Sequence, residues 1–457
     1  MGTGGREHAL GEALFRSEAP LYVAGAWKNP GLVRRAKDYL LVAPTEGEAI
    51  ARWARTRQVE LAVVGPDAAV AAGVADRLRA EGIVTVGPGA QAARLESSKA
   101  FQREFMVRHR LPGVPRHEVV DRPEDLSRAV ASLGVPFVVK PTGLTAGKGV
   151  WVQGLDFAED TEGIAYAKRL LGSGAGSVVL EERLEGEEFS FMAFVDGHRL
   201  APMPLVQDYK RALEGNRGPN TGGMGSYSER DHLLPYLTRE DRDAAFSILT
   251  RTVEALRSDG MEYRGVLYGG FLLTREGPMV LEFNARFGDP EALNVLTLFD
   301  GTDFADLLYG VGSGSMDPAH AGFRLRATVV KYLAPPGYPS APRPGGTLTV
   351  DLEALADLAV TPYYASATPG PAPGQVIMGS SRSLALVGEA SARHDADGRV
   401  EEALSFVKGD YQVRHDVAGV TDVAARVAHL ERLRNIPPFV AERNPTRSGP
   451  TPPPVFT

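Results

Sequence analysis

The chain has 457 residues, 43% of them hydrophobic and 23% charged, a composition typical of folded globular proteins. Its net charge of −7 argues against general binding to nucleic acid or to a membrane surface, and no apolar run approaches the roughly 18 residues of a membrane span. It contains no cysteine, which excludes disulfides, thiolate nucleophiles and cysteine-based metal sites and fits a cytoplasmic protein.

Residues 1–95 alternate short apolar runs with amphipathic segments. Four runs predict buried strands: LYVAGA (21–26), YLLVAP (39–44), ELAVVGP (60–66) and IVTVGP (83–88). Between them, EGEAIARWARTRQ (46–58) has helical periodicity. This alternation predicts an open, Rossmann-like parallel sheet, which binds ligands at the carboxyl ends of its strands.

The beginning of this sheet has an unusual sequence. Residues 2–10 (GTGGREHAL) predict a glycine-rich turn that leads into a helix, and such a turn normally follows a buried strand. Only Met1 precedes it here, and loss of that strand would leave backbone groups unpaired on both neighbours. We expect the sheet to lack its first strand, with the true start roughly 5–8 residues upstream. The alternative is a shortened domain in which the two neighbouring strands close up.

Two further domains and a tail follow. Residues 96–312 mix strand-like runs with longer helices, and REDRDAAFSILTRTVEALRS (239–258) places Phe246, Leu249, Val253 and Leu256 on one buried helical face. A Gly/Ser-rich break (310–318) separates this domain from a small α+β domain at 319–435. The proline-rich residues 436–457 predict a disordered tail.

Two lysines bracket a glycine-rich loop in the middle domain. In GLTAGKGV (143–150), glycines let backbone N–H groups approach phosphate oxygens, and Lys148 adds a positive charge. Lys140 ends the apolar run before the loop, where an anion or a protein carboxylate must compensate its charge. The pair favours a phosphate site, although a flexible turn with a solvated lysine is the alternative for the loop.

Acidic and polar residues follow two later strands. In VVLEERLEGEEFSF (178–191), the pairs Glu181-Glu182 and Glu187-Glu188 flank a hinge-like glycine and suit ribose hydroxyls or an adenine amino group, unless they are simply solvated. In VLEFNARFGDPEAL (280–293), Glu282, Asn284 and Arg286 alternate along one strand face. Carboxylate and amide oxygens suit Mg²⁺ beside phosphates, and the arginine suits an acyl phosphate or a γ-phosphate.

A long polar segment, QDYKRALEGNRGPNTGGMGSYS (207–228), lies between these strands. Its PNTGGMG stretch offers backbone donors for a small anion such as a carboxylate, and Asp208, Lys210 and Arg211 add charges. An ordinary loop is disfavoured because structureless loops of this length are usually functional.

With these segments in order, the chain resembles the glycinamide ribonucleotide synthetase (phosphoribosylamine–glycine ligase) family of ATP-grasp ligases. The matching strings are GTGGREHA, VVGPDA, ESSKAF, GLTAGKGV, LEERLEGEEFSF, QDYKR, GPNTGGMGSYS and LEFNARFGDPE, within residues 2–291. RFGDPE together with GPNTGGMG is the most specific evidence. The third domain looks more like the archaeal form of the family.

The resemblance implies a central ATP-grasp domain (96–312) with a mobile lid at about 113–187. It also implies ligation of glycine to 5-phosphoribosylamine through glycyl phosphate, with release of ADP and phosphate, in purine biosynthesis. The implied cofactors are ATP and Mg²⁺ (or Mn²⁺), and the implied partners are these small molecules, without nucleic acid or membrane. We expect a monomer or weak oligomer.

The resemblance also assigns roles to residues. Those implied to bind ATP are Lys99, Lys140, Gly147, Lys148, Gly149, Glu181, Glu182 and Glu188. Glu282 and Asn284 would bind the metal, and Arg286, Lys148 and Asp289 would be catalytic. Those implied to bind glycine or phosphoribosylamine are Gly4, Gly5, Arg6, Glu7, Asp208, Lys210, Pro219, Asn220, Thr221, Gly222, Gly223 and Met224. The sequence departs from the archaeal pattern at Gly270, where a metal-ligating Gln is expected.

Three rival interpretations remain. Another purine-pathway ATP-grasp enzyme, using formate or bicarbonate, is disfavoured by PNTGGMG and RFGDPE. An oxidoreductase would need an acid at the end of the second strand, and YVAGAW (22–27) offers none. The third is a nucleotide-binding module that lacks activity because of its shortened first domain.

Overall fold

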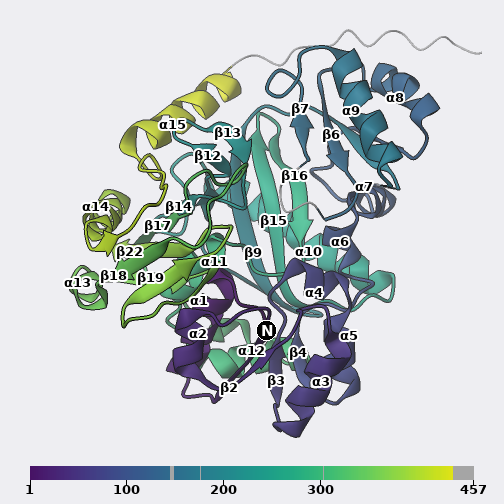
Figure 1. Cartoon of the computed structure of the whole chain (residues 1–457). Helices are drawn as coiled ribbons and strands as arrows, with labels where there is room; N and C mark the ends of the chain where they lie inside the picture. The colour runs from purple at the N-terminus through teal and green to yellow at the C-terminus, as the bar shows by residue number, and fades with distance from the viewer. Residues whose placement is uncertain (145–148, 175, 302, 436–457) are drawn as a thin grey trace, which may run out of the picture.

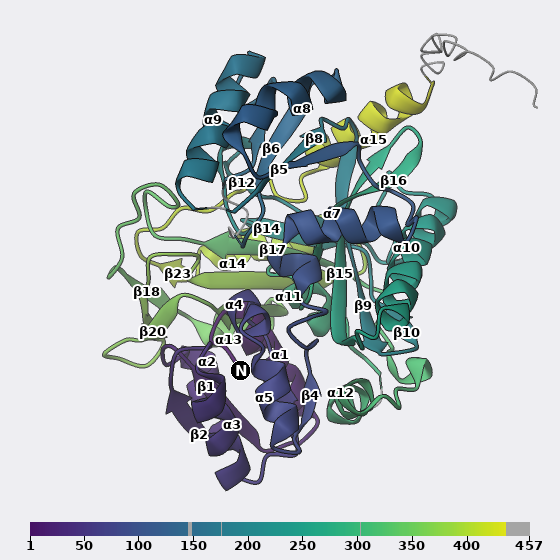
Figure 2. The same cartoon turned by 90° about the vertical axis from the view of Figure 1, so that its right-hand side faces the viewer.

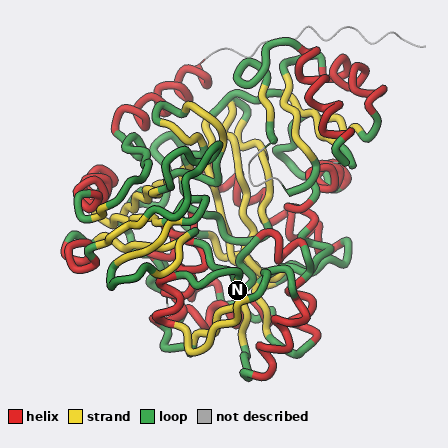
Figure 3. The backbone as a smooth tube through the Cα atoms, viewed as in Figure 1, coloured by secondary structure: helices red, strands yellow, loops and turns green. Residues whose placement is uncertain are grey.

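The computed structural model describes residues 1–144, 149–174, 176–301 and 303–435. The N-terminal unit lies at the bottom of Figure 1 and the C-terminal unit at the left of a central sheet. The segment at about 113–187, which is called the lid after its predicted role, lies at the upper right. Figure 3 shows the strands gathered in the middle with most helices around them. Gly147, Lys148 and the predicted tail at 436–457 lie outside the described residues. Within the described ranges, no helix is long and apolar enough to cross a membrane.

The N-terminal unit consists of short parallel strands and helices, as predicted. Its elements are α1 (Gly5–Arg16), β1 (Leu21–Gly25), α2 (Pro30–Arg35), β2 (Ala36–Leu41), α3 (Gly47–Thr56), β3 (Leu61–Val63), α4 (Asp67–Ala71), α5 (Val74–Ala80) and β4 (Val84–Val86). β1 pairs in parallel with β2, and β3 pairs in parallel with β4. The parallel arrangement follows from the strand–helix alternation, because each helix carries the chain back to the start of the next strand.

Among the described residues no strand precedes α1 or joins β1 to β3, as the sequence predicts. Instead, the first two residues bridge the two strand pairs. The Met1 amine donates to the Val63 carbonyl at 2.9 Å, and the Gly2 N–H donates to the Ala24 carbonyl at 2.8 Å. The two pairs do not close up, and a cavity of about 650 Å³ with largely apolar walls lies between β1 and β3.

The lid is a four-stranded sheet with strand order β5-β8-β6-β7, and all its pairs are antiparallel. Two short helices, α6 (Arg94–Ser97) and α7 (Lys99–Arg108), connect it to the N-terminal unit. Its elements are β5 (His117–Val120), η1 (Pro123–Asp125), α8 (Leu126–Leu133), β6 (Phe137–Pro141), β7 (Trp151–Val152), α9 (Asp160–Gly172) and β8 (Val178–Glu182). α8 and α9 pack on one face, where apolar side chains such as Phe137 and Leu180 form a separate small core.

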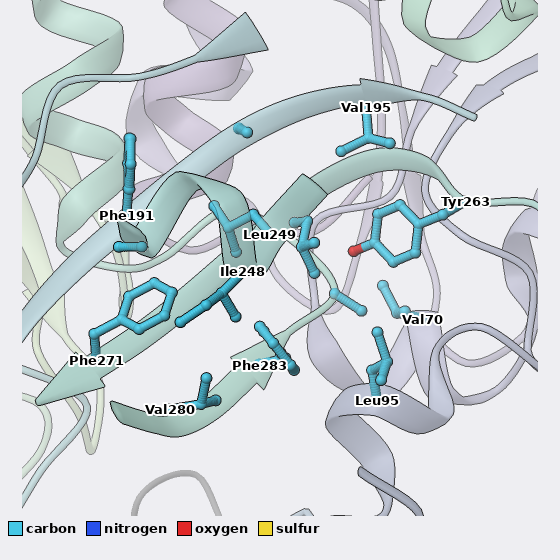
Figure 4. Close-up of a cluster of buried hydrophobic side chains, with 14 of the residues drawn as sticks. Val70, Leu95, Phe191, Val195, Ile248, Leu249, Tyr263, Phe271, Val280 and Phe283 are labelled. Atoms are coloured by element: carbon cyan, nitrogen blue, oxygen red, sulfur yellow. The ribbon is translucent and has the colours of Figure 1, made fainter. Parts of the chain in front are cut away.

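The central sheet has the order β10-β9-β15-β16, with β9 (Glu187–Asp196), β10 (Leu200–Pro202), β15 (Arg264–Thr274) and β16 (Gly277–Asn284). Both its faces are buried. On β9, Phe191 and Val195 face one core, whereas Phe194 faces another, as the period of two requires. Figure 4 shows the first core, where side chains of β9, β15 and β16 meet helix α10 (Arg239–Ser258) and Val70 of the N-terminal unit.

Helix α10 confirms the predicted helix at 239–258. Leu249, Val253 and Leu256 are buried in the first core, and Phe246 packs against it partly buried. Thr238 caps its first turn by accepting a hydrogen bond from the Asp241 N–H at 3.2 Å. The opposite face of the sheet is covered by α11 (Glu291–Leu298) and α12 (Phe304–Ser313).

The C-terminal unit contributes a five-stranded antiparallel sheet with the order β11-β14-β17-β22-β19. The strands β11 (Gln207–Asp208) and β14 (Gly225–Ser228) come from the long polar segment of the middle domain, which also forms the hairpin β12 (Arg211–Leu213) and β13 (Arg217–Asn220). The remaining elements are η2 (Pro318–His320), β17 (Ala327–Leu333), β18 (Thr347–Val350), α13 (Leu352–Asp357), β19 (Val360–Tyr364), β20 (Ala367–Pro369), β21 (Gln375–Met378), β22 (Leu384–Ala390), α14 (Arg393–Leu404), β23 (Val407–Lys408) and α15 (Val420–Asn435). The polar segment and the C-terminal unit therefore share one sheet.

Gly5 allows α1 to pack closely against the C-terminal unit, and replacing it by Ala should destabilise the protein. Ala normally stabilises a helix by about 1 kcal/mol relative to Gly, but a Cβ here would collide with Tyr332 Oη. We expect Gly5→Ala to cost about 1–3 kcal/mol, measured by thermal unfolding. Gly398→Ala in α14, where a Cβ meets nothing within 4 Å, is the matched control and should stabilise. An equal effect of both changes would contradict the collision.

Candidate functional site

Three units of the chain meet at one polar cavity of about 250 Å³. Its lining includes Arg6 and Asp67 from the N-terminal unit, β16 residues from the central sheet, and Arg382 from the C-terminal unit. Figure 2 shows the same convergence, with α1 and α11 below β14 and β17, and the direct packing of α1 on α11 agrees with it. The larger cavity between β1 and β3 is mainly apolar, so the chemistry of the chain is concentrated in the smaller one.

Glu282, Asn284 and Arg286 line this cavity together, but they do not all share one strand face as the sequence predicts. β16 ends at Asn284, and Arg286 lies in the bend that follows it. Asn284 Nδ2 lies 3.4 Å from Glu282 Oε1, and Arg286 Nη2 donates to Asn284 Oδ1 at 3.1 Å. Arg286 Nη2 also lies 2.9 Å from Glu96 Oε1. Burial acts to lower the pKa of Arg286, but the carboxylates of Glu96 and Asp67 outweigh it, so the pKa lies above its ordinary value. The arginine is a fixed cation at the cavity wall.

Glu282 is the least engaged carboxylate of this group, since its only hydrogen bond among the described residues is the long one from Asn284. Burial would raise the pKa of Glu282, but three lysines, Lys210, Lys99 and Lys140, more than offset it and hold the pKa below its ordinary value. Glu282 is therefore an ionised, nearly unbonded carboxylate that faces the cavity. Gly270 lies directly opposite it on β15, so no side chain from that position supplies a further oxygen.

Asp208 and Lys210 form a second charged edge. Lys210 Nζ lies 2.7 Å from Glu188 Oε2, and the carboxylates of Glu188, Glu282 and Asp208 outweigh the effect of burial and raise the pKa of Lys210. Asp208 Oδ1 is buried and has no hydrogen-bond partner within the described ranges. Burial, and then the nearby Glu291 carboxylate, raise the pKa of Asp208 well above its ordinary value. An unpaired acceptor of this kind is costly unless a ligand satisfies it.

Lys140 and Glu181 form a buried pair at the base of the lid. Glu181 Oε2 lies 2.6 Å from Lys140 Nζ, and Arg103 of α7 donates to both oxygens of the same carboxylate at 2.7 and 3.2 Å. Burial alone would raise the pKa of Glu181, but Arg103 and Lys140 lower it to about 2. Of the two sequence interpretations of Lys140, the structure supports a protein carboxylate as its compensating charge.

Asp289 connects the three units. Its Oδ1 accepts a hydrogen bond from Tyr332 Oη at 2.6 Å, and its Oδ2 lies 3.4 Å from the Arg6 N–H at the start of α1. Arg382 Nη1 lies 3.3 Å from Asp289 Oδ1. Burial would raise the pKa of Asp289, but Arg382 and Arg6 outweigh it and lower the pKa. The ionised aspartate thus fixes the N-terminal loop, in which Gly4 N–H donates to Glu7 Oε2 at 2.7 Å.

The structure brings about half of the predicted site residues into the cavity lining. These are Arg6, Lys99, Asp208, Lys210, Thr221, Gly222, Glu282, Asn284, Arg286 and Asp289. Others contact the lining residues or their neighbours: Gly4, Gly5, Glu7, Lys140, Glu181, Glu188 and Gly223. Met224 is buried in a small cluster with Ala334 and Tyr338. Glu182 pairs with Arg116 at the lid surface, Pro219 and Asn220 lie on β13, and Gly149 has its carbonyl bound by Tyr166.

Several lining residues were missed by the sequence reasoning. Glu96, Asp67, Gln102, Tyr268, Glu291 and Arg382 all contribute to the cavity wall. Glu96 and Asp67 stand inside the strings ESSKAF and VVGPDA, which carry the family resemblance, so their position in those motifs was an available signal. Arg382 stands in SSRS (380–383), where a single arginine in a polar turn gives no local indication of a ligand.

Known proteins match the chain over nearly its whole length. Residues 1–96 match the family model described as phosphoribosylglycinamide synthetase, N domain, and residues 97–292 match its ATP-grasp (A) domain. Phosphoribosylamine–glycine ligases of Pyrococcus abyssi and Methanocella arvoryzae are 44% and 46% identical to the chain; each alignment covers 95% of it, and 97% and 99% of the relatives.

Solved structures show the same fold. The crystal structure of phosphoribosylamine–glycine ligase from Thermotoga maritima matches with a TM-score of 0.75 and 28% identity, covering 91% of this chain and 98% of that one. The biotin carboxylase domain of a Hydrogenobacter thermophilus 2-oxoglutarate carboxylase, in complex with MgADP and bicarbonate, matches with a TM-score of 0.68, covering 94% of this chain and 92% of that one. Its 15% identity makes this a likeness of fold alone.

Proposed function

The chain belongs to the phosphoribosylamine–glycine ligase family, and from this membership we propose how its cavity performs the reaction. The protein is a C–N ligase that uses ATP to join glycine to 5-phosphoribosylamine, giving glycinamide ribonucleotide, ADP and phosphate in purine biosynthesis. The observation that carries the assignment of the site is the single cavity where the charged residues of three units meet.

The reaction needs an activated carboxyl group, because a carboxylate is a poor electrophile. A glycine carboxylate oxygen attacks the γ-phosphorus of ATP, which gives glycyl phosphate and ADP. The amine nitrogen of phosphoribosylamine then attacks the acyl carbon, so that a C–N bond forms, the C–O bond to phosphate breaks and the amine releases a proton. No protein nucleophile takes part, and the residues contribute positioning and charge neutralisation.

Arg286 is placed to stabilise the acyl phosphate. Its guanidinium is fixed by Glu96 and Asn284 at the cavity wall, so it can act on a developing charge without first reorganising. Lys99 also lines the cavity, and Lys140 lies behind Glu282; both add positive charge for the phosphates of ATP. Lys148 and Gly147, which lie outside the described residues, stay predicted to bind ATP, Lys148 through its charge and Gly147 through its backbone.

Glu282 and Asn284 fit a Mg²⁺ or Mn²⁺ ion. The donor set consists of hard oxygens, and the Glu282 carboxylate is ionised with only one long hydrogen bond. Asn284 would contribute its amide oxygen, which accepts from Arg286 Nη2 in this structure while the amide nitrogen lies nearer Glu282. A bound ion would neutralise phosphate charge. The described residues contain no cluster of three or more His, Cys, Asp or Glu suited to a metal, so ATP phosphates and water would complete the coordination.

Asp208 is suited to the ammonium group of glycine, because its buried Oδ1 faces the site without a partner. The backbone of Pro219–Met224 would position the glycine carboxylate, and Lys210 would add charge beside it. The N-terminal loop from Gly4 to Glu7, with Asp289, would face phosphoribosylamine. Glu182 and Glu188 would hold adenosine, whereas Glu181 acts by fixing Lys140.

The proposed setting is the cytoplasm, with small molecules as the only partners. We propose that the chain works as a monomer or weak oligomer. Size-exclusion chromatography with light scattering would test this statement.

The decisive assay is ADP release with Mg²⁺, glycine and phosphoribosylamine generated in situ, omitting each component in turn. We expect release to require both substrates and to fail when formate or bicarbonate replaces glycine. Release with formate or bicarbonate would indicate a different ATP-grasp ligase. Folded protein that binds ATP but releases no ADP under any condition would reduce the function to nucleotide binding.

A further inference from the structure

We propose that Arg382 of the C-terminal unit and Arg6 of the N-terminal loop together bind the phosphate group of the sugar-phosphate acceptor. The proposal deepens the function proposed above and rests on it. Both guanidinium groups line the same cavity and are largely buried, with 14% and 11% of their side chains exposed. Both residues also contact Asp289: Arg382 does so through its guanidinium, and Arg6 through its backbone N–H, so one carboxylate lies between the two segments that carry the cations.

Each guanidinium is anchored on one side, and its second terminal nitrogen is left for a ligand. Arg382 Nη1 donates to the carbonyls of Gly222 and Gly223 at 2.8 Å and of Asp289 at 3.1 Å. Arg6 Nη1 donates to the Phe287 carbonyl at 3.1 Å, and its Nε donates to the adjacent Glu7 carboxylate at 2.6 Å. Within the described ranges, neither Nη2 atom has a hydrogen-bond partner. Two arginines that are fixed in this way present donors of the geometry that phosphate oxygens accept.

The surrounding groups hold Arg382 rigidly and suit a sugar. The Arg382 guanidinium carbon lies 4.5 Å from the centre of the Tyr332 ring, which stacks beneath it. Asp289 and Glu7 beside the two arginines supply acceptors for ribose hydroxyls. The two arginines can donate to a phosphate group, and the neighbouring carboxylates can accept from hydroxyl groups. This combination matches a phosphate ester of a sugar, rather than a simple amino acid or a nucleoside.

This inference gives the C-terminal unit a part in recognising the acceptor. Arg382 stands just before β22, and its three carbonyl partners belong to the polar segment and to the turn before α11. The acceptor site is therefore complete only when the C-terminal unit is docked on the central sheet. Arg382 touches the acceptor directly and not the reacting carboxyl group, so its loss should change acceptor affinity more than turnover.

The test is Arg382→Gln, because glutamine keeps a donor for the loop carbonyls but removes the charge. We expect the KM for phosphoribosylamine and the Kd for ribose 5-phosphate, measured by calorimetry, to rise by about 10–100-fold. The KM values for ATP and glycine should stay within about twofold, and this result would also show that the variant is folded. Arg6→Gln should weaken ribose 5-phosphate binding similarly, and Arg343→Gln, at an exposed arginine of the same unit, is the control.

Two outcomes would overturn the inference. One is unchanged binding of ribose 5-phosphate by Arg382→Gln; the other is an equal loss of affinity for all three substrates, which would indicate a purely structural role. Arg382→Lys keeps the positive charge but loses the planar guanidinium, which can donate two parallel hydrogen bonds. Its KM for phosphoribosylamine should lie between those of the unaltered protein and Arg382→Gln. Because ADP release by the unaltered protein tests the ligase reaction itself, failure of the Arg382 variants to behave as expected leaves the proposed function standing.

Discussion

Replacing Glu282 by Gln is expected to lower kcat/KM by about a hundred- to a thousandfold, the size seen when one preorganised electrostatic group is removed from an active site. Glu282 is ionised, faces the cavity and has only a long hydrogen bond from Asn284. Its loss therefore removes the charge that would hold a divalent ion while leaving the fold largely intact. The measurement is ADP release across a range of Mg²⁺ concentrations, with part of the lost rate recovered at high Mg²⁺.

The matched control for this change is Glu276→Gln, at the exposed turn of the same β15–β16 hairpin. It should leave kcat/KM and its Mg²⁺ dependence unchanged. A Glu282→Gln variant that keeps normal activity at low Mg²⁺ would remove Glu282 from the metal site. A loss of activity that is the same at every Mg²⁺ concentration would instead assign the carboxylate another role.

The sequence predicted the structure best where a pattern of neighbouring residues within one element determines which side chains are buried or face the site. Alternation along one strand was enough to place Glu282 and Asn284 on one cavity wall, because the period of a strand is fixed by its backbone. Arg286 reaches the same wall from the bend that follows the strand. Helical periodicity likewise predicted α10 together with its buried face. The family strings then identified the reaction, which no amount of periodicity could have supplied.

Contacts between distant segments could not be predicted in this way. Lys140 had two possible partners in the sequence, and its partner Glu181 lies on a different strand of the lid. Arg103 of α7 completes that group, but its sequence resembles that of any amphipathic helix. The pairing of β14 with β17 of the C-terminal unit could not be predicted either, because β17 lies about a hundred residues further along the chain.

The buried group of Arg103, Lys140 and Glu181 leads to the second large effect, a loss of stability in Glu181→Gln. The change leaves two buried cations without their counter-charge, which should cost about 3–5 kcal/mol and lower the temperature of unfolding by several degrees. Glu182→Gln, at the neighbouring residue that pairs with the exposed Arg116, is the matched control and should cost less than about 1 kcal/mol.

The pH dependence separates this ionic effect from a packing defect. The pKa of Glu181 is lowered to about 2 in the folded protein from an ordinary value of 4.5, so its contribution is fully present above about pH 4.5 and is lost as the pH falls toward 2. The stabilities of the unaltered protein and of Glu181→Gln should therefore converge as the pH is lowered through this range. A constant difference between them would mean that lost packing, and not lost charge, destabilises the variant.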